Sequence, residues 1–249
     1  MELIFLSDFR IRPVGDSAVT VEFGSSIDPA VNGRVHALCS LLDGAEVPGI
    51  SDMIPTFCSL LINYDPGVIR YDALCREIRR VAESNTASAA APSRTFLISV
   101  CYGGDYGEDL PYVAEHAGIS EREVIRRHAA PDYLIYMLGF LPGFSYLGGM
   151  DPKLETPRLS QPRQLIPAGS VGIGGNQTGL YPLDSPGGWR LIGRSPVRPY
   201  DPRREEPILY RAGDKIRFVP IDEKEYRKIE KAVNAGTYEC PYLEGGRRR

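Results

Sequence analysis

Residues 139–196 read GFLPGFSYLGGMDPKLETPRLSQPRQLIPAGSVGIGGNQTGLYPLDSPGGWRLIGRSP, and this stretch decides the fold of the C-terminal half. Glycine and proline at this density exclude long helices. They also interrupt any regularly alternating strand. We therefore predict short strands joined by tight turns. Loops on a rigid scaffold often carry binding or catalytic side chains, so the functional residues are expected here.

The segments on either side of this stretch complete a barrel. Thr95–Tyr102 and Asp132–Leu138 are apolar enough for buried strands, and Ser120–Glu123 is a helix-capping box. Ala212-Gly213-Asp214 between Ile208–Arg211 and Lys215–Pro220 is typical of a hairpin. A last amphipathic helix is expected from about residue 222 to residue 235. Many short strands with Gly/Pro turns favour a compact β-barrel domain over residues 95–249.

The N-terminal part alternates strands with helices. Ser17–Phe23 and Phe57–Tyr64 have strand patterns, and Asp28-Pro29 marks the start of a helix. A second amphipathic helix begins near Tyr71. We predict a small α+β domain over residues 1–84, of the ferredoxin-like type. The small polar residues 85–94 are predicted to form a linker.

The overall composition excludes several functional classes. The 249 residues carry a net charge of −3, which argues against general nucleic-acid or membrane binding. The sequence has no apolar stretch of bilayer length, and its N-terminus lacks the cationic lead of a signal peptide. The five cysteines are scattered, with no metal-binding spacing. We expect a cytoplasmic protein with reduced thiols and no metal site.

Arginine is the prevailing cation in the glycine-rich stretch. Arg158 and Arg163 each follow a proline, which keeps the backbone extended. The planar guanidinium suits carboxylates and phosphates, so this pair is a candidate anion site and a candidate part of the catalytic machinery. The alternative is that both are surface arginines in ordinary ion pairs.

Gly169–Gly175 (GSVGIGG) is rich in glycine but matches neither common nucleotide motif. The P-loop needs a Gly-Lys-Ser/Thr ending, and the dinucleotide motif needs a glycine where Gln177 stands. Two interpretations remain open, a tight barrel turn or a backbone nest that binds an anion. On the second interpretation the anion- or nucleotide-binding residues are Gly169, Ser170, Gly172 and Arg194.

His128 is the histidine that lies nearest to this stretch. It is either a general acid or base facing the barrel mouth or a residue stabilised at a helix C-terminus. Ser145 does not lie in a nucleophile elbow, because Leu147 replaces the required glycine.

A set of neutral polar and aromatic residues predicts a pocket for a small, flat, amide-like ligand. The alternative is that the aromatic residues form the barrel core. The candidate substrate-binding residues are Phe140, Phe144, Tyr146, Gln177, Thr178, Tyr181 and Trp189.

Five motifs, in order, resemble those of one protein family. They are Val100–Gly104, Gly139–Phe144 with Tyr146-Leu147, Ile166–Ile173, Gln177–Gly179 with Tyr181-Pro182, and Ser185–Trp189 with Ile192–Arg194. The sequence resembles the family of 5-oxoprolinase B subunits, also called KipI or allophanate hydrolase subunit 1. The resemblance implies a cyclophilin-like barrel. It also implies work with subunits A and C of an ATP-dependent complex that opens 5-oxo-L-proline to L-glutamate.

The resemblance leaves the roles of single residues to inference. Our hypothesis is that Arg158 and Arg163 bind a phosphate or the substrate carboxylate, that Gln177 and Thr178 hold the amide, and that His128 moves a proton. ATP with Mg²⁺ is expected on a partner or at a subunit interface. The isolated chain is expected to be inactive. Two other functions stay open: inhibition of a sensor histidine kinase, and a part in urea or allophanate metabolism beside a biotin-bearing partner.

Overall fold

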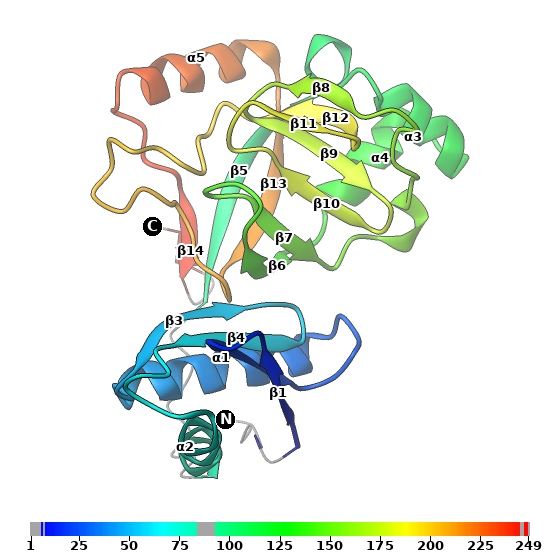
Figure 1. The fold of residues 1–249 in the computed structure, drawn as a ribbon. Coiled ribbons are helices and arrows are strands. Elements are labelled where there is room, and N and C mark those ends of the chain that lie inside the picture. The colour runs from blue at the N-terminus through cyan, green and yellow to red at the C-terminus, as the bar shows by residue number, and fades with distance from the viewer. Residues whose placement is uncertain (1–5, 7, 84–92, 245–246, 249) are drawn as a thin grey trace. The chain divides into compact units, whose positions relative to one another are not determined.

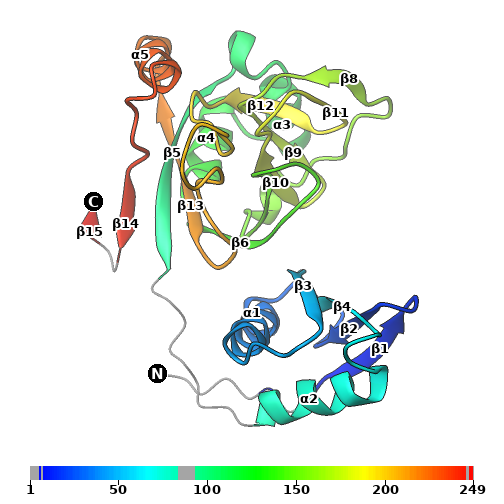
Figure 2. The same ribbon diagram turned by 60° about the vertical axis from the view of Figure 1, so that its left-hand side comes forward.

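The computed structural model describes residues 6, 8–83, 93–244 and 247–248. Internal contacts divide the chain into two units, with the boundary between residues 91 and 92. That boundary falls in the predicted linker, of which residues 85–92 lie outside the described residues. Figures 1 and 2 show the elements of each unit.

The first unit is a four-stranded antiparallel sheet with two helices. Its elements are β1 (Arg10–Val14), β2 (Ala18–Glu22), α1 (Pro29–Gly44), β3 (Ile50–Pro55), β4 (Ser59–Tyr64) and α2 (Tyr71–Glu83). The strand order is β1-β2-β4-β3. In a ferredoxin-like sandwich the edge strand beside β2 would follow the second helix. Here the N-terminal strand β1 takes that place, paired to β2 as a hairpin.

Local sequence explains most of this unit. Asp28 caps α1 by accepting hydrogen bonds from the backbone of Ala30 and Val31. Alternate residues of β2 and β4 are buried against Leu38 of α1, so one face of the sheet carries the core. Strands β1 and β3 were not predicted, because their side chains are mostly exposed and show no apolar alternation.

The second unit is a nearly closed barrel. Its strands β10-β9-β12-β5-β13-β6-β7 form one continuous sheet, and β10 lies against β7, which brings the two edges together. Figure 1 shows α3 and α4 beside the barrel, with α5 apart from them. The strands are β5 (Arg94–Tyr102), β6 (Tyr133–Leu138), β7 (Ser145–Gly148), β8 (Arg163–Ile166), β9 (Ser170–Gly174), β10 (Gln177–Leu180), β11 (Ser185–Gly187), β12 (Arg190–Arg194), β13 (Lys215–Ile221), β14 (Tyr242–Glu244) and β15 (Arg247–Arg248). The helices are α3 (Leu110–Ala117), α4 (Glu121–His128) and α5 (Glu223–Asn234), with 3₁₀ turns at Gly104–Tyr106 and Pro152–Leu154.

The predicted hairpin around Gly213 is wrong. Ile208–Arg211 forms no strand there, and Ile208 makes only an isolated bridge to Tyr200. Strand β13 instead pairs in parallel with β5 and, at its start, antiparallel with β6. The Gly213 backbone N–H donates to Ile135 of β6. A turn signal marks where the chain bends, but the partner of the following strand is set by the long-range core.

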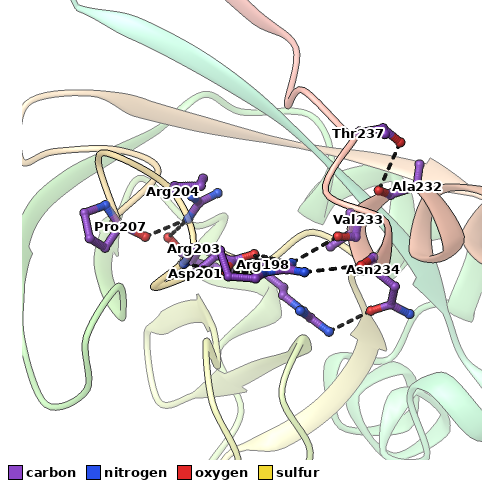
Figure 3. A network of polar contacts seen from close by, with 10 residues as sticks. Arg198, Asp201, Arg203, Arg204, Pro207, Ala232, Val233, Asn234 and Thr237 are labelled. Atoms are coloured by element: carbon purple, nitrogen blue, oxygen red, sulfur yellow. Dashed lines mark hydrogen bonds and ion pairs between the residues drawn. The ribbon is translucent and has the colours of Figure 1, made fainter.

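The loop after β12 is fastened to the C-terminal end of α5 by arginines. Arg203 donates to the carbonyls of Val233 (3.2 Å) and Asn234 (3.2 Å) and also pairs with Asp201. Arg198 donates to the Asn234 side chain at 2.7 Å. Figure 3 shows these side chains meeting at the helix end. The unpaired carbonyls of a helix C-terminus carry partial negative charge, so the guanidinium groups stabilise it.

Three glycines of the barrel form a seat for Trp189. A Cβ added at Gly174 would lie 2.4 Å from the indole, and one at Gly179 would lie 3.0 Å from it. A Cβ at Gly172 would lie 3.3 Å from the Trp189 Cβ and 3.0 Å from the Arg190 carbonyl. Gly172 and Gly179 are directly paired between β9 and β10. The glycine-rich sequence is therefore explained by the indole, which lies against the strands.

This arrangement predicts that Gly174→Ala displaces Trp189. Forcing an extra methyl group into a filled space costs about 1–3 kcal/mol of stability. Trp189 is the sole tryptophan of the chain, so its emission reports on this place alone. We expect red-shifted emission and a lower urea midpoint. Gly188→Ala is the matched control, because an added Cβ there would lie 3.7 Å from its nearest neighbour. Equal effects in both variants would show that Gly174 does not make room for the indole.

Candidate functional site

The Trp189 cluster consists of Phe144, Ile166, Tyr181, Trp189 and Leu191, on the outer face of the barrel. Its aromatic rings pack edge to face. The ring centres of Phe144 and Tyr181 lie 5.8 Å and 6.1 Å from that of Trp189, and both rings are tilted steeply to the indole. These are favourable aromatic geometries. Phe144, Tyr181 and Trp189 were predicted either to line a ligand pocket or to form a core, and each is at least 94% buried, which favours the core.

Arg158 lies over this cluster with its guanidinium exposed. Its Cζ is 5.9 Å from the centre of the Trp189 ring, within cation–π range. Hydrogen bonds from Leu159 to Gly188 (2.7 Å) and from Arg190 to Pro157 (3.4 Å) fix the segment around it. Among the described residues no carboxylate forms an ion pair with Arg158. Its fork of N–H donors therefore faces solvent and is available to an anion.

Arg163, in contrast, is already paired. It donates to Asp109 at 2.9 Å and to the Trp189 carbonyl at 3.3 Å, and Glu108 lies 3.0 Å away. The structure therefore favours an ion-paired Arg163, which was one of the two alternatives. It still contributes positive charge beside Arg158.

Asp109 is a functional candidate that sequence analysis missed. Only 8% of the residue is exposed. Its carboxylate accepts from Arg163 and from the Leu191 backbone at 2.7 Å, and Arg190 lies 3.7 Å away. Gly107 lets this segment approach β12, because a Cβ there would lie 2.1 Å from the Ile192 carbonyl.

Tyr181 belongs to the Trp189 cluster and feels the charge of both predicted arginines. Burial raises the pKa of Tyr181 to about 12, although Arg158, Arg163 and a backbone hydrogen bond with Trp189 act in the opposite direction. Arg158 lies over the Trp189 ring, Arg163 donates to the Trp189 carbonyl, and Tyr181 meets the same indole, so the structure brings the two arginines together at Trp189. The phenol stays protonated at neutral pH.

Gln177 and Thr178 point to opposite faces of β10. Thr178 is fully buried and bonds within the barrel interior. Successive side chains of a strand alternate, so Gln177 shares the outer face with Gly179, which Trp189 covers. The two residues therefore cannot hold an amide ligand together. Of the two, only Gln177 lies on the outer face, where it could do so.

His128 lies in the barrel core and not at the barrel mouth. It is 0% exposed and stacks on Phe218. Thr178 donates its proton to the Gly172 carbonyl (3.0 Å), so His128 Nε2–H must donate to Thr178 (2.7 Å). Nδ1 then accepts from the Tyr102 hydroxyl at 2.8 Å. These hydrogen bonds are all satisfied with a neutral imidazole. Burial lowers the pKa of His128 to about 3. The predicted role of His128 as a proton shuttle is therefore wrong. His128 instead links Tyr102 of β5 to Thr178 of β10 through hydrogen bonds.

The buried imidazole predicts a loss of stability in acid. The pKa of His128 is below its unfolded value, so the unfolded chain binds the extra proton, and stability falls as pH drops below about 6.5. At pH 5 the loss attributable to His128 is on the order of 2 kcal/mol. Urea unfolding followed by Trp189 emission at pH 7.5 and pH 5 tests this. His128→Gln should show a smaller acid loss than the wild type; an identical loss would refute the assignment.

The four residues predicted to bind a nucleotide do not form a nest. Ser170 and Gly172 belong to β9, which is paired on both sides, and the Gly169 N–H donates to Tyr181. Their backbone donors are therefore used within the barrel, and the set does not fit a polyphosphate. Gly169 instead lines a separate hollow of about 740 Å³, with Tyr226 of α5 and Val197 on its wall. Arg194 adjoins this hollow, its Cγ 3.4 Å from where a Gly169 Cβ would lie.

Phe140 and Tyr146 border the Trp189 cluster. Phe140 is 63% exposed and meets Phe144 edge to face at 5.6 Å. Tyr146 contacts Phe144 at 5.3 Å. Neither ring is part of the closed core, so both remain candidate contacts for something outside the chain.

The described ranges also lack two kinds of feature. Within residues 8–83 and 93–244, no helix combines the length and apolarity needed to cross a bilayer. The same residues hold no group of three or more His, Cys, Asp or Glu side chains placed to bind a metal ion.

Comparison with known proteins identifies the family. Residues 9–210 match the family model described as carboxyltransferase domain, subdomain C and D. The 5-oxoprolinase B subunit of Bacillus subtilis (strain 168) is 42% identical over 237 residues, which covers 91% of this chain and 98% of that protein. This chain belongs to the family of 5-oxoprolinase B subunits.

Solved structures confirm the α+β fold with its barrel. The crystal structure of TTHA0988 has a TM-score of 0.74 and 38% sequence identity, over 86% of this chain. This chain spans only 40% of TTHA0988, so in that protein the family unit is joined to further polypeptide. Kluyveromyces lactis urea carboxylase matches 95% of this chain, and 24% of its own, with a TM-score of 0.79 and 20% identity, which shows the shared fold alone.

Proposed function

We propose that this chain is the B subunit of an ATP-dependent 5-oxoprolinase, which works with subunits A and C to hydrolyse 5-oxo-L-proline to L-glutamate. The named relative is matched over almost its whole length, which supports a shared role. The observation that carries the proposal is Arg158, an exposed guanidinium over Trp189 without an ion-pair partner among the described residues. The substrate is a small ring with one carboxylate, and this surface offers a fixed anion receptor on an aromatic base.

The chain's residues divide the work of binding. Arg158 binds the substrate carboxylate through its planar fork. Arg163, whose donors are used by Asp109 and Trp189, adds positive charge without a direct contact. Gln177, on the same outer face as the cluster, hydrogen-bonds the lactam. The Tyr181 hydroxyl, protonated because burial raises its pKa, stays neutral beside the bound anion.

The nucleotide is assigned no residue of this chain. The glycine-rich strand cannot supply free backbone donors for a polyphosphate. We propose that ATP with Mg²⁺ binds to another subunit or to a surface that forms on assembly.

Reconstitution from three separately purified subunits tests the proposal. The complete mixture should release glutamate from 5-oxo-L-proline only when ATP is present, and omission of this chain should abolish the release. Urea in place of 5-oxo-L-proline should give no turnover. Glutamate release by subunits A and C alone, at the same rate, would overturn the proposal.

A further inference from the structure

The hollow of about 740 Å³ in the second unit has no part in the proposed function. Its walls come from α5, from the turn before β9 and from the loops around residues 182–184 and 195–202. It shares no lining residue with the Trp189 cluster. Sites for small molecules usually measure about 300–1,000 Å³, so the hollow is large enough for a ligand.

Two arginines bring positive charge to this hollow. Arg198 lines it and donates to the Asn234 side chain at 2.7 Å (Figure 3). Arg194 adjoins it, with its Cγ 3.4 Å from where a Cβ on the wall residue Gly169 would lie. The Arg194 Nε is buried and has no hydrogen-bond partner. In the part of the chain that the structure describes, neither guanidinium forms an ion pair. A buried charge without a partner is costly, so a bound carboxylate would stabilise Arg194.

Two hydroxyl groups add neutral donors near Arg194. Ser170 is directly opposite Arg194 in the pairing of β9 with β12, so the two side chains share one face of the sheet. The Ser170 Oγ is buried and also lacks a hydrogen-bond partner. Tyr226 of α5 lines the hollow. Burial raises the pKa of Tyr226 to about 12, although the charge of Arg194 acts in the opposite direction, so its hydroxyl keeps the proton and can donate it to an anion.

Carboxylates on the same walls limit the kind of anion that fits. Asp184 and Glu230 line the hollow and form no ion pair with any residue that the structure describes. A third acid, Asp201, is already paired with Arg203. Two free negative charges beside two free positive charges disfavour a multiply charged phosphate. They are complementary to a ligand that carries both signs of charge.

We propose that this hollow binds a free α-amino acid with an acidic side chain. Its two carboxylates pair with Arg194 and Arg198. Its ammonium group pairs with Glu230 or Asp184, so each charge of the ligand meets an opposite charge on the wall. The site is separate from the Arg158 surface, and its occupation needs no turnover. Only the choice of L-glutamate as the probe rests on the proposed function, which makes it the product.

Calorimetric titration of the full chain with L-glutamate tests the site. Arg158→Ala serves as the parent protein, because it removes the other anion receptor. The parent should bind L-glutamate saturably, and Arg194→Gln in this parent should weaken binding at least about 10-fold, as expected for a lost charge-assisted hydrogen bond. Arg122→Gln is the matched control, since Arg122 is exposed and does not line the hollow. No saturable binding to the parent, or an equal loss for Arg122→Gln, would overturn the proposal.

Glu230→Gln tests the ammonium contact and does not depend on whether Arg194→Gln folds. Glu230 is exposed, so the variant should keep the Trp189 emission and thermal midpoint of the parent. Its affinity for L-glutamate should fall at least about 10-fold. An affinity equal to that of the parent would refute the pairing of the ammonium group with this wall.

Two analogues of L-glutamate test the ligand class on the same parent. Glutarate lacks the ammonium group and L-glutamine lacks the second carboxylate, so each should bind more weakly than L-glutamate. Equal affinity for glutarate would show that the hollow takes any dicarboxylate, and equal affinity for L-glutamine would show that it does not select an acidic side chain; either result would overturn the proposal. A reconstituted mixture that releases no glutamate would refute the proposed function and leave these affinities unchanged.

Discussion

Arg158→Ala is expected to lower kcat/KM of the reconstituted complex about 100-fold, the equivalent of about 3 kcal/mol. The structure leaves this guanidinium exposed over Trp189 with no ion pair among the described residues, so its donors are free for the substrate carboxylate. The loss should fall mainly on KM, because the carboxylate takes no part in breaking the amide bond and is bound alike in the ground and transition states.

Arg158→Lys is the informative companion. It keeps the charge but loses the planar fork, so we expect a loss of about 10-fold, between alanine and wild type. Thermal midpoints should match the wild type, because Arg158 is exposed and contributes little packing. Steady-state kinetics at fixed subunit ratio give both values. If Arg158→Ala retains full kcat/KM, the substrate carboxylate binds elsewhere.

Asp109→Ala is expected to have the largest effect on stability, about 3 kcal/mol, because it removes one partner of a mostly buried charge pair. The variant removes the buried carboxylate partner of Arg163 and leaves the Leu191 N–H without its acceptor. Urea unfolding followed by Trp189 emission reports on the second unit, where both residues lie.

Asp109→Asn separates charge from hydrogen bonding. Its amide oxygen still accepts from Leu191, so the loss of stability should be smaller than for alanine. Exposed Asp105→Ala is the control and should stay within about 0.5 kcal/mol of wild type. A midpoint for Asp109→Ala that matches the control would show that the carboxylate does not hold the Trp189 cluster together.

Local rules predicted the elements that have strong local signals. Asp28 and Ser120 cap the helices predicted to start there, and the last helix starts after Asp222, close to the expected residue. Apolar runs such as Thr95–Tyr102 became buried strands. These elements are determined by residues that are close in the sequence, so the sequence alone is enough to predict them.

Long-range features escaped prediction. The parallel pairing of β13 with β5 joins residues more than a hundred positions apart. The glycines of β9 were ambiguous until Trp189 was placed against them. His128 looked chemically able, but its partners Tyr102 and Thr178 come from distant strands and hold it neutral. Asp109 was invisible because a single carboxylate before a helix is typical of an N-cap, and only folding brings Arg163 to it.

The most direct test of the account is whether 5-oxo-L-proline binds at the Arg158–Trp189 surface. Labelling this chain with 5-fluorotryptophan gives a single ¹⁹F resonance, because Trp189 is its sole tryptophan. In the assembled complex with unlabelled partners, 5-oxo-L-proline should shift that resonance saturably, and Arg158→Ala should abolish the shift at the same concentrations. A resonance that does not move while the complex turns over substrate would contradict the account.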